Sequence, residues 1–287
     1  MQKIVAIFFL LIFLSCKKDP ATFELNNLNN GEIGCFGHAG MGFYSNYPVN
    51  SWPGFESCLN RGADGTEMDI QVTKDSVLVI LHDEYLQQST SCSGTVKELN
   101  WADINNCNIP SKFFKDSKLM SFDEFIKKVP NPKNHIYTWD CKLRVFGDDA
   151  YNKLYARAIV NTINKYDLTD NVFIENPFDD FLQNIKDLKP DAHLFVLADD
   201  FDEGLKKVKQ HAFYGLSMHT NKVTARQVTT AHDSAVYVTI YGVLSEKENY
   251  GAIEKCPDFI QTDNINYLLK VFSKYNRGKG FLYDVTK

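Results

Sequence analysis

Short apolar segments alternate with amphipathic segments from residue 33 to the end of the chain, and this alternation constrains the fold more than any other feature. Eight apolar segments have the length of β-strands, and stretches with helical spacing of apolar residues separate most of them. The predicted strands span residues 33–38, 65–72, 135–142, 171–176, 193–198, 213–218, 235–242 and 258–263. The predicted helices span residues 52–61, 150–166, 179–188, 203–210, 224–231, 247–255 and 266–275.

Strands that alternate with helices are typical of parallel sheets with helical crossovers. Eight such strands over about 250 residues favour a closed barrel, and a doubly wound sheet is the alternative, because it differs only in strand order. Residues 77–82 add a hairpin arm after the second strand, and residues 85–134 are too long for a plain connection. We therefore predict an α/β fold, a (β/α)8 TIM barrel with a small insertion after the second strand. The insertion is expected to hold short helices within 97–106 and 121–129.

The first residues have the features of an export signal. Lys3 precedes an unbroken apolar run from Ile4 to Leu14, which is too short to span a bilayer. The run ends in Phe-Leu-Ser-Cys, which resembles the lipobox of bacterial lipoproteins and makes Cys16 the predicted lipidation site; an ordinary secretory signal is the alternative. We predict a lipoprotein signal peptide over 1–15, a polar tether over 16–32 and a barrel domain over 33–287. The protein would then be exported to a bacterial cell envelope and anchored to a membrane through Cys16.

Six cysteines follow Cys16, and none of them forms a CxxC pair, so a zinc site is not expected. Cys92 and Cys107 lie in a loop-like region and are the pair to expect if an exported chain forms a disulfide. Three others, in apolar strand or helix contexts, are predicted to be buried: Cys35, Cys58 and Cys141. The formal net charge is −5 without a basic tract, so nucleic acid is not an expected partner. No feature indicates an oligomeric state.

Polar side chains gather where the predicted strands end. Glu67 and Asp69 share one face of the second strand because side chains alternate along a strand. Asp140 and Lys142 share a face of the third strand in the same way. His38 ends the first strand, and His82 ends the hairpin arm. Active sites of barrels lie at the carboxyl ends of the strands, so we expect these six side chains to meet.

Carboxylates that converge repel each other unless a cation or a proton lies between them. Oxygen ligands suit a hard cation, Mg²⁺ or Ca²⁺, whereas solvent-facing acids paired with lysines are the structural alternative. The two histidines suit proton transfer near neutral pH. Four other histidines are expected to be structural, and His219 is a secondary candidate for substrate contact; the four are His135, His193, His211 and His232.

The motif order from "GHAG" through "PVNSWPGFESCLNRGADGTEMDIQVTKDSVLVILHDEYLQQST" resembles the glycerophosphodiester phosphodiesterase family. In that family H-R-G is followed by P-E-N-T, by G-A-D-G-x-E-x-D-V-x-x-T-K-D and by an apolar run that ends in H-D. Weaker similarity continues through "YTWDCK", "FIENPFDDFLQNIKDLKP" and "FIQTDN", so the resemblance extends over nearly all of the predicted mature chain.

The resemblance implies a (β/α)8 barrel with an insertion that hydrolyses glycerophosphodiesters to an alcohol and glycerol 3-phosphate with a divalent cation. It implies roles for the residues in the quoted motifs: His38 and His82 as the acid–base pair, Glu67 and Asp69 as metal ligands, Asp140 in place of a glutamate ligand, and Lys142 at the substrate phosphate.

Two positions depart from the family pattern. Ala39 replaces the arginine that would hold phosphate through two hydrogen bonds, and Val49 replaces the glutamate of P-E-N-T. Substrate preference is therefore expected to differ from that of the family. A non-catalytic lipoprotein that binds phosphodiesters or a partner remains an alternative. A glycoside hydrolase is another, because "DGTEMD" is similar to the acidic strand of chitinase-type barrels, although that function would leave the two histidines and Lys142 without a role.

Overall fold

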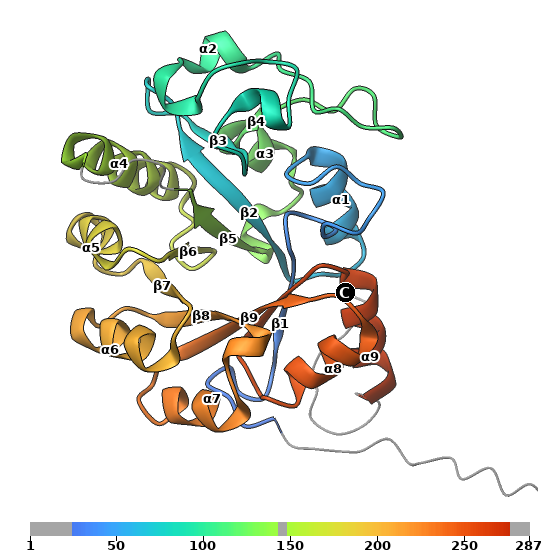
Figure 1. Cartoon of the computed structure of the whole chain (residues 1–287), viewed down its shortest axis with the longest axis vertical. Helices are drawn as coiled ribbons and strands as arrows, with labels where there is room; N and C mark the ends of the chain where they lie inside the picture. The colour runs from blue at the N-terminus through green and yellow to red at the C-terminus, as the bar shows by residue number, and fades with distance from the viewer. Residues whose placement is uncertain (1–24, 143–147, 276–287) are drawn as a thin grey trace, which may run out of the picture.

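Eight parallel strands close into a barrel in the computed structural model, which describes residues 25–142 and 148–275. The first strand, β1, pairs in parallel with the last strand, β10, at Gly34↔Phe259 and with β2 at Phe36↔Gly65. These two pairings close the ring and exclude the doubly wound alternative, which would leave open edges. The predicted TIM barrel is therefore confirmed (Figure 1).

All eight predicted barrel strands are present within two residues of their expected bounds. They are β1 (Gly34–Gly37), β2 (Gly65–Val72), β5 (Ile136–Cys141), β6 (Val172–Asn176), β7 (His193–Ala198), β8 (Gly215–His219), β9 (Tyr237–Val243) and β10 (Phe259–Thr262). The outer helices are α1 (Trp52–Asn60), α4 (Asp149–Tyr166), α5 (Asp179–Leu188), α6 (Phe201–His211), α7 (Ala225–His232), α8 (Glu246–Ile253) and α9 (Ile265–Tyr275). Serine or threonine N-caps with Glu or Gln three residues later begin α7 and α8 and fix their starts.

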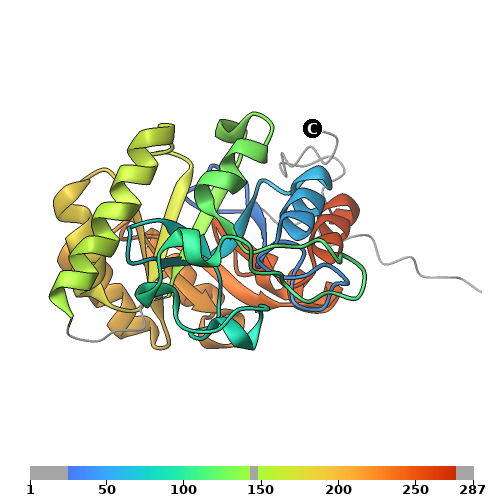
Figure 2. The ribbon, with the colours of Figure 1, turned by 90° about the horizontal axis from the view of Figure 1, so that it is seen from above.

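The insertion between β2 and β5 forms a small layer on one side of the barrel, and Figure 2 looks onto it from above. It contains β3 (Leu78–Ile80), β4 (Met120–Ser121), α2 (Trp101–Ile104), α3 (Phe122–Lys128) and three short 3₁₀ turns (Leu86–Gln88, Val96–Glu98 and Pro132–Asn134). β3 runs antiparallel to β2 through the pair Ile70↔Ile80. Cys92 and Cys107, the candidate pair of the sequence analysis, form a disulfide with 5.5 Å between the two Cα atoms. The disulfide joins a separate apolar cluster that includes Val79, Leu86 and Ile104.

The interior of the barrel changes from apolar to polar along the strands. Phe36, Phe173, Phe195 and Phe259 form a buried aromatic layer. On three of these strands the residue two positions further on, which points inward by the same alternation, is polar. These residues are His38, Glu175 and Gln261, and they lie toward the carboxyl ends of the strands. The aromatic layer thus forms the floor beneath a polar mouth.

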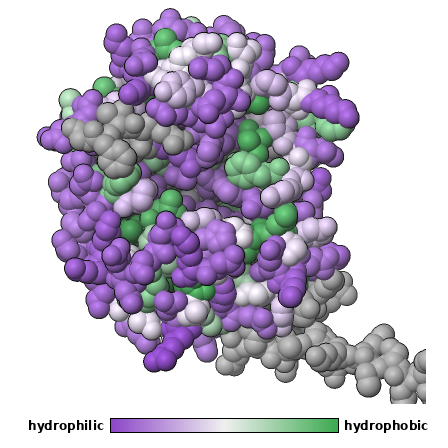
Figure 3. Space-filling model, in the orientation of Figure 1, coloured by the Kyte–Doolittle hydropathy of each residue, from purple (hydrophilic) through white to green (hydrophobic). Residues whose placement is uncertain are grey.

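Cys35, Cys58 and Cys141 are buried free thiols, as expected from their apolar neighbours. Cys16 and the predicted signal peptide lie outside the described residues. Within residues 25–142 and 148–275, no helix combines the length and the apolar character needed to cross a bilayer. On the face drawn in Figure 3, hydrophilic residues predominate and hydrophobic residues form small separate patches.

Candidate active site

Three carboxylates meet at the mouth of the barrel. Glu67 and Asp69 point inward from β2, and Asp140 faces Asp69 from the neighbouring strand β5. One oxygen of each residue lies within 4.8 Å of the corresponding oxygens of the other two. Glu67 and Asp69 are each only 1% exposed, so water screens their repulsion poorly. The predicted convergence of these acids is therefore present, and the alternative in which they face solvent is not.

Lys142 provides part of the compensating charge. Its ammonium lies 2.9 Å from Asp69 Oδ1 and 2.6 Å from Asp140 Oδ2. Asn50 holds the other side of Asp69, because its side-chain amide donates to Asp69 Oδ2 at 2.6 Å and its carbonyl oxygen accepts from the Asp69 backbone N–H at 3.2 Å. Asp69 is thereby fixed by an ion pair and two hydrogen bonds.

Glu67 is less completely compensated. Its Oε2 accepts a hydrogen bond of 2.7 Å from the Ala39 backbone N–H, but its buried Oε1 has no hydrogen-bond partner among the described residues. Burial, followed by the charge of Asp69, raises the pKa of Glu67 well above its usual value. Burial also raises the pKa of Asp140. At Asp69 burial opposes ionisation as well, but Lys142, His82 and the hydrogen bond from Asn50 together outweigh it and lower the pKa. The three acids thus share a site that favours additional positive charge.

A hard cation could bind to the Glu67 oxygen that has no hydrogen-bond partner among the described residues. The set of three carboxylates offers only oxygen donors, which suit Mg²⁺ or Ca²⁺. A buried polar atom without a partner is costly in a folded protein, and coordination would remove this cost. The residues present therefore fit a divalent cation.

His38 lies beside Glu67 and is oriented by a residue that directly follows the last strand. Its Nδ1 is 2.9 Å from Asp263 Oδ1, and its Nε2 is 3.7 Å from Glu67 Oε2. Burial would lower the pKa of His38, but the carboxylates of Glu67 and Asp263 outweigh burial and raise it to about 9. The ring of Phe43 contacts the His38 ring at 4.8 Å between centroids. His38 is thus held on several sides while about a quarter of its side chain remains exposed.

His82 reaches the same mouth through the hairpin arm. The backbone N–H of Leu81 donates to the carbonyl of Asp69 at 2.9 Å, and the side-chain amide of Gln71 donates to the carbonyls of Leu81 and Asp83. These bonds hold both neighbours of His82, whose Nδ1 lies 3.0 Å from Asp83 Oδ1. The hairpin therefore carries His82 to the end of β2, where a positive charge on its ring helps to lower the pKa of Asp69.

Two partners of the site are absent from the sequence-based set. Asp263, which orients His38, follows the last strand, and its position at a strand end was the available signal. Glu175 is buried on β6, where Gln261 donates to it at 2.8 Å. Burial raises the pKa of Glu175 to about 7, and the charge of Asp140 adds to this effect. Glu175 thus adds a buried carboxylate opposite Asp140 on the neighbouring strand.

Among the described residues, none of the remaining histidines forms an ion pair with Glu67, Asp69 or Asp140. His219 ends β8, contacts the ring of Tyr241 and accepts a hydrogen bond from the Asn221 backbone N–H, so it shapes its own turn. The four histidines expected to be structural lie on or near other elements: His135 and His193 at the starts of β5 and β7, His211 near Asp179, and His232 bound to Asp258.

The two departures from the family pattern lie next to each other. Ala39 is fully buried at a positive φ of 48°, and its carbonyl accepts from the Asn50 backbone N–H at 3.1 Å. Val49, directly before Asn50, is half-buried. The Ala39 backbone N–H and the Asn50 side chain therefore still hold Glu67 and Asp69, although neither departing side chain offers a charge.

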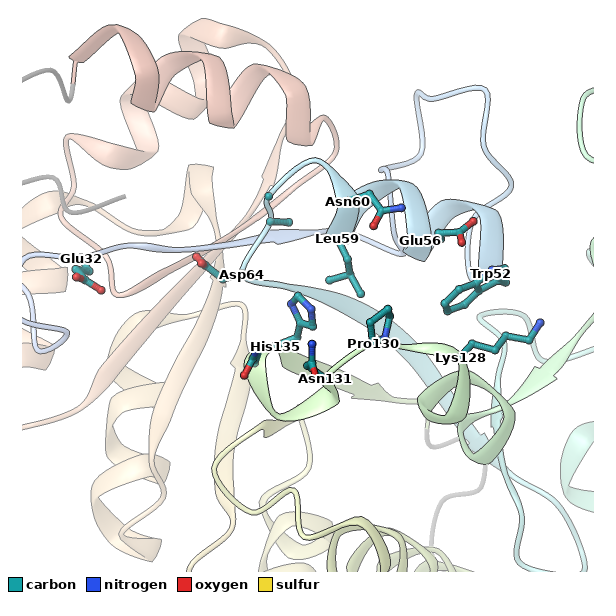
Figure 4. A pocket seen from close by; sticks show the side chains of 13 residues that line it. Glu32, Trp52, Glu56, Leu59, Asn60, Asp64, Lys128, Pro130, Asn131 and His135 are labelled. Atoms are coloured by element: carbon teal, nitrogen blue, oxygen red, sulfur yellow. The ribbon is translucent and has the colours of Figure 1, made fainter. Parts of the chain in front are cut away.

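A cavity of about 820 Å³ lies away from this site. Glu32, Asp64 and His135, which line it, precede β1, β2 and β5, so the cavity is at the amino ends of the strands (Figure 4). Catalytic residues of barrels come from the opposite ends, and features at the amino ends contribute to stability. The carboxyl-end mouth is therefore the better candidate for chemistry.

Comparison with known sequences gives one family. The sequence model of the "Glycerophosphoryl diester phosphodiesterase family" matches residues 41–267. A glycerophosphodiester phosphodiesterase of Bacillus altitudinis is 25% identical over 240 residues, which cover 81% of this chain and 96% of that protein. Another, from Bacillus subtilis (strain 168), is 33% identical over 115 residues, which cover 39% of each chain.

Solved structures share the fold. A putative glycerophosphoryl diester phosphodiesterase from Silicibacter pomeroyi DSS-3 aligns with a TM-score of 0.77 at 17% identity, over 90% of this chain and 98% of that one. A phosphodiesterase from Oleispira antarctica, solved with the product sn-glycerol-3-phosphate, aligns with a TM-score of 0.72 at 16% identity, over 84% of this chain and 96% of that one.

Proposed function

The chain belongs to the glycerophosphoryl diester phosphodiesterase family, and on this basis we propose that it is an enzyme that hydrolyses glycerophosphodiesters to an alcohol and glycerol 3-phosphate. The observation that carries the proposal is the meeting of Glu67, Asp69 and Asp140 with Lys142 beside His38. This arrangement offers a place for a phosphoryl group and groups that exchange protons with it.

The contacts of these side chains support a role for each of them. Glu67, Asp69 and Asp140 would hold Ca²⁺ or Mg²⁺. When bound, the cation would polarise the phosphoryl oxygens and offset their charge. Lys142, already at the edge of the acid cluster, would contact the phosphate. His38 and His82 would accept a proton from the nucleophile and donate one to the leaving alcohol. The nucleophile would be water, or a neighbouring hydroxyl of the substrate that displaces the alcohol to form a cyclic phosphate, which water then opens to glycerol 3-phosphate. Both routes would use the same two histidines.

Ala39 and Val49 carry no charge, in contrast to the family residues at these positions. Among the predicted site residues, Lys142 is then the one basic side chain besides the histidines that would contact the phosphate. An arginine would have added two directed hydrogen bonds to the phosphate. We expect weaker binding of the phosphodiester group and greater dependence on the cation than in a site that retains the arginine.

We also propose that the protein works outside the cytoplasm, anchored to a membrane of the cell envelope through Cys16. The apolar run and lipobox-like ending before Cys16 support this location. The Cys92–Cys107 disulfide supports it independently, because structural disulfides persist mainly in oxidising compartments. Mass spectrometry of the mature N-terminus tests it: a diacylglycerol-modified Cys16 is expected, and an unmodified N-terminus elsewhere would contradict lipidation.

The catalytic proposal is tested by His38→Ala and His82→Ala. Each variant should lower the hydrolysis of glycerophosphocholine and glycerophosphoethanolamine by about 10²-fold or more, because positioned acid–base groups contribute factors of this size. Released glycerol 3-phosphate is the measurement, and circular dichroism reports folding. His193→Gln, at the amino end of β7, is the matched control and should retain activity. Full activity in either alanine variant would overturn the assigned roles, whereas ligand binding without turnover by the wild type would favour a binding protein.

A further inference from the structure

The loop formed by residues 110–118 differs in charge from the rest of the molecule. It contains three lysines and one aspartate, a formal charge of +2, in a chain whose formal net charge is −5. At its tip Phe113 is 60% exposed, and the ammonium of Lys112 lies 5.3 Å from the centre of its ring. Lys115 is exposed on the other side of the two phenylalanines. An exposed aromatic ring between two lysines needs an explanation, because the proposed chemistry uses none of these residues.

The loop projects from the insertion and is tied at its base. At its base Ile109 N–H donates to Ser117 O at 2.8 Å, and Leu119 N–H donates to Cys107 O at 2.8 Å. Cys107 is also joined to Cys92 by the disulfide. Figures 1 and 2 show the loop extending beside the connection between β1 and α1. The exposure of Phe113 is thus imposed by a braced loop.

The same loop is coupled to the active-site side of the barrel. Phe114 stacks on Tyr47 with 4.9 Å between ring centroids. Tyr47 belongs to the β1–α1 connection, which begins with His38 and carries two more exposed aromatic residues, Phe43 (45%) and Tyr44 (74%). The exposed aromatic tip is therefore fixed relative to the segment that carries His38.

We propose that the 110–118 loop docks the enzyme on a lipid bilayer that contains anionic head groups. Phe113 enters the interfacial region of the bilayer, while Lys112 and Lys115 interact with the lipid phosphates. Aromatic rings and lysines are the side chains favoured at such interfaces, and each lysine close to an anionic surface adds to the attraction.

Charge and composition favour a bilayer over a protein partner. Lysine is depleted at protein–protein interfaces, whereas here two exposed lysines flank the exposed ring. A lipid anchor at Cys16 would tether the barrel through a polar segment without fixing its orientation. Docking through the loop fixes that orientation and turns the side that carries the β1–α1 connection toward the bilayer.

The test uses tryptophan at the tip of the loop in the full-length chain. Phe113→Trp should show a blue-shifted emission and strong quenching by brominated lipid in vesicles of phosphatidylethanolamine and phosphatidylglycerol. Tyr267→Trp, another exposed aromatic position, on α9, is the matched control and should show neither effect. Adding Lys112→Glu and Lys115→Glu to Phe113→Trp should reduce the quenching on the order of tenfold, and zwitterionic phosphatidylcholine vesicles should reduce it similarly. High salt should weaken the effect.

Each alternative has its own outcome. Equal quenching at positions 113 and 267 would mean that the chain is held at the membrane without a preferred orientation, and this would overturn the proposal. No quenching at position 113 would overturn it as well. A concentration-dependent spectral change of Phe113→Trp without vesicles would identify the loop as a contact between two copies of the chain instead. Hydrolysis of soluble glycerophosphocholine by Lys112→Glu/Lys115→Glu should equal that of the wild type, which separates a failure of docking from a failure of the proposed function.

Discussion

At the scale of single residues, the pair formed by His38 and Asp263 shows how the barrel orients the histidine that we propose as a proton-transfer group. The carboxylate of Asp263 lies 2.9 Å from Nδ1 of His38, which directs Nε2 toward Glu67 and the mouth. Asp263 therefore acts as a positioning residue that selects the ring orientation and favours the protonated imidazole. Asp83 orients the ring of His82 through a similar contact with its Nδ1.

Replacing Asp263 by Asn tests this role. The amide keeps the shape of the carboxylate but removes its charge, so the pKa of His38 should fall from its raised value of about 9. We expect kcat to fall about tenfold to hundredfold with little change in KM, and the limb of the pH–rate profile that reports His38 to move to lower pH. Asp167→Asn, an exposed position at the end of α4, is the control. An unchanged pH profile would show that Asp263 does not act through His38.

The residues that could be predicted from the sequence are those whose position depends on strand alternation. Glu67, Asp69, Asp140 and Lys142 follow from the inward face of two strands, and the structure brings them together. Asp263 could not be assigned to His38 in this way, because 225 residues separate the two and only closure of the barrel makes them neighbours. The ion pairs of Lys142 with Asp69 and Asp140 depend likewise on side-chain reach, which alternation does not determine.

At the scale of elements, the acidic residues at the two ends of the barrel strands differ in what they do. The carboxyl ends gather the acids of the candidate site, whereas the amino end of β2 begins beside Asp64, whose Oδ2 accepts from the Cys35 backbone N–H at 2.8 Å. Burial raises the pKa of Asp64 to about 7, and this hydrogen bond opposes the shift only in part. Asp64 therefore ties β1 to β2 but costs stability whenever it is ionised.

The sign of this effect gives a pH prediction. The pKa of Asp64 is about 7 in the folded protein and near its ordinary 3.8 in the unfolded chain, so the folded state binds the proton more tightly. Stability from this group is present below about pH 4 and is lost as the pH rises to about 7. Asp64→Asn removes the charge. The unfolding free energy of the variant relative to that of the wild type should therefore rise by on the order of 2 kcal/mol as the pH increases from 5 to 8. Urea unfolding at both pH values measures the difference, and an advantage independent of pH would contradict it.

The order of elements could be predicted because each strand–helix unit of the barrel has its own local sequence pattern. A strand-length apolar run followed by an amphipathic helix is visible without knowledge of its neighbours, as for β6 and α5, whose helix bounds match the expectation. The insertion was recognisable from its length, from the hairpin arm and from two short helical stretches, but not in its packing. Its separate apolar cluster and the braced 110–118 loop depend on contacts such as Ile109 with Ser117 and Phe114 with Tyr47. Neither contact is marked by a periodic pattern of apolar residues in the sequence.

At the scale of the whole molecule, binding of a cation at the three acids should stabilise the fold, because ligands that bind only the folded state shift the unfolding equilibrium. The carboxylates come from β2 and β5, while Asn50 and Ala39 bring the β1–α1 connection to the same acids. At a concentration 100-fold above Kd, about 2.7 kcal/mol of stabilisation is expected. This corresponds to a rise in Tm of roughly 5–10 °C for a domain of this size. Calorimetry with Ca²⁺ or Mg²⁺, and again after EDTA, measures the shift.

Glu67→Gln identifies the site of that stabilisation without relying on activity. Without cation the variant should be at least as stable as wild type, because it removes a buried carboxylate whose charged form is disfavoured by burial and by Asp69. With cation its Tm should no longer rise, because the oxygen left without a partner in the wild type is replaced or neutralised. Glu56→Gln on the exposed face of α1 is the matched control and should keep the full response. A full response in Glu67→Gln would place the cation elsewhere, and no response in the wild type at millimolar concentrations would refute a cation at this mouth.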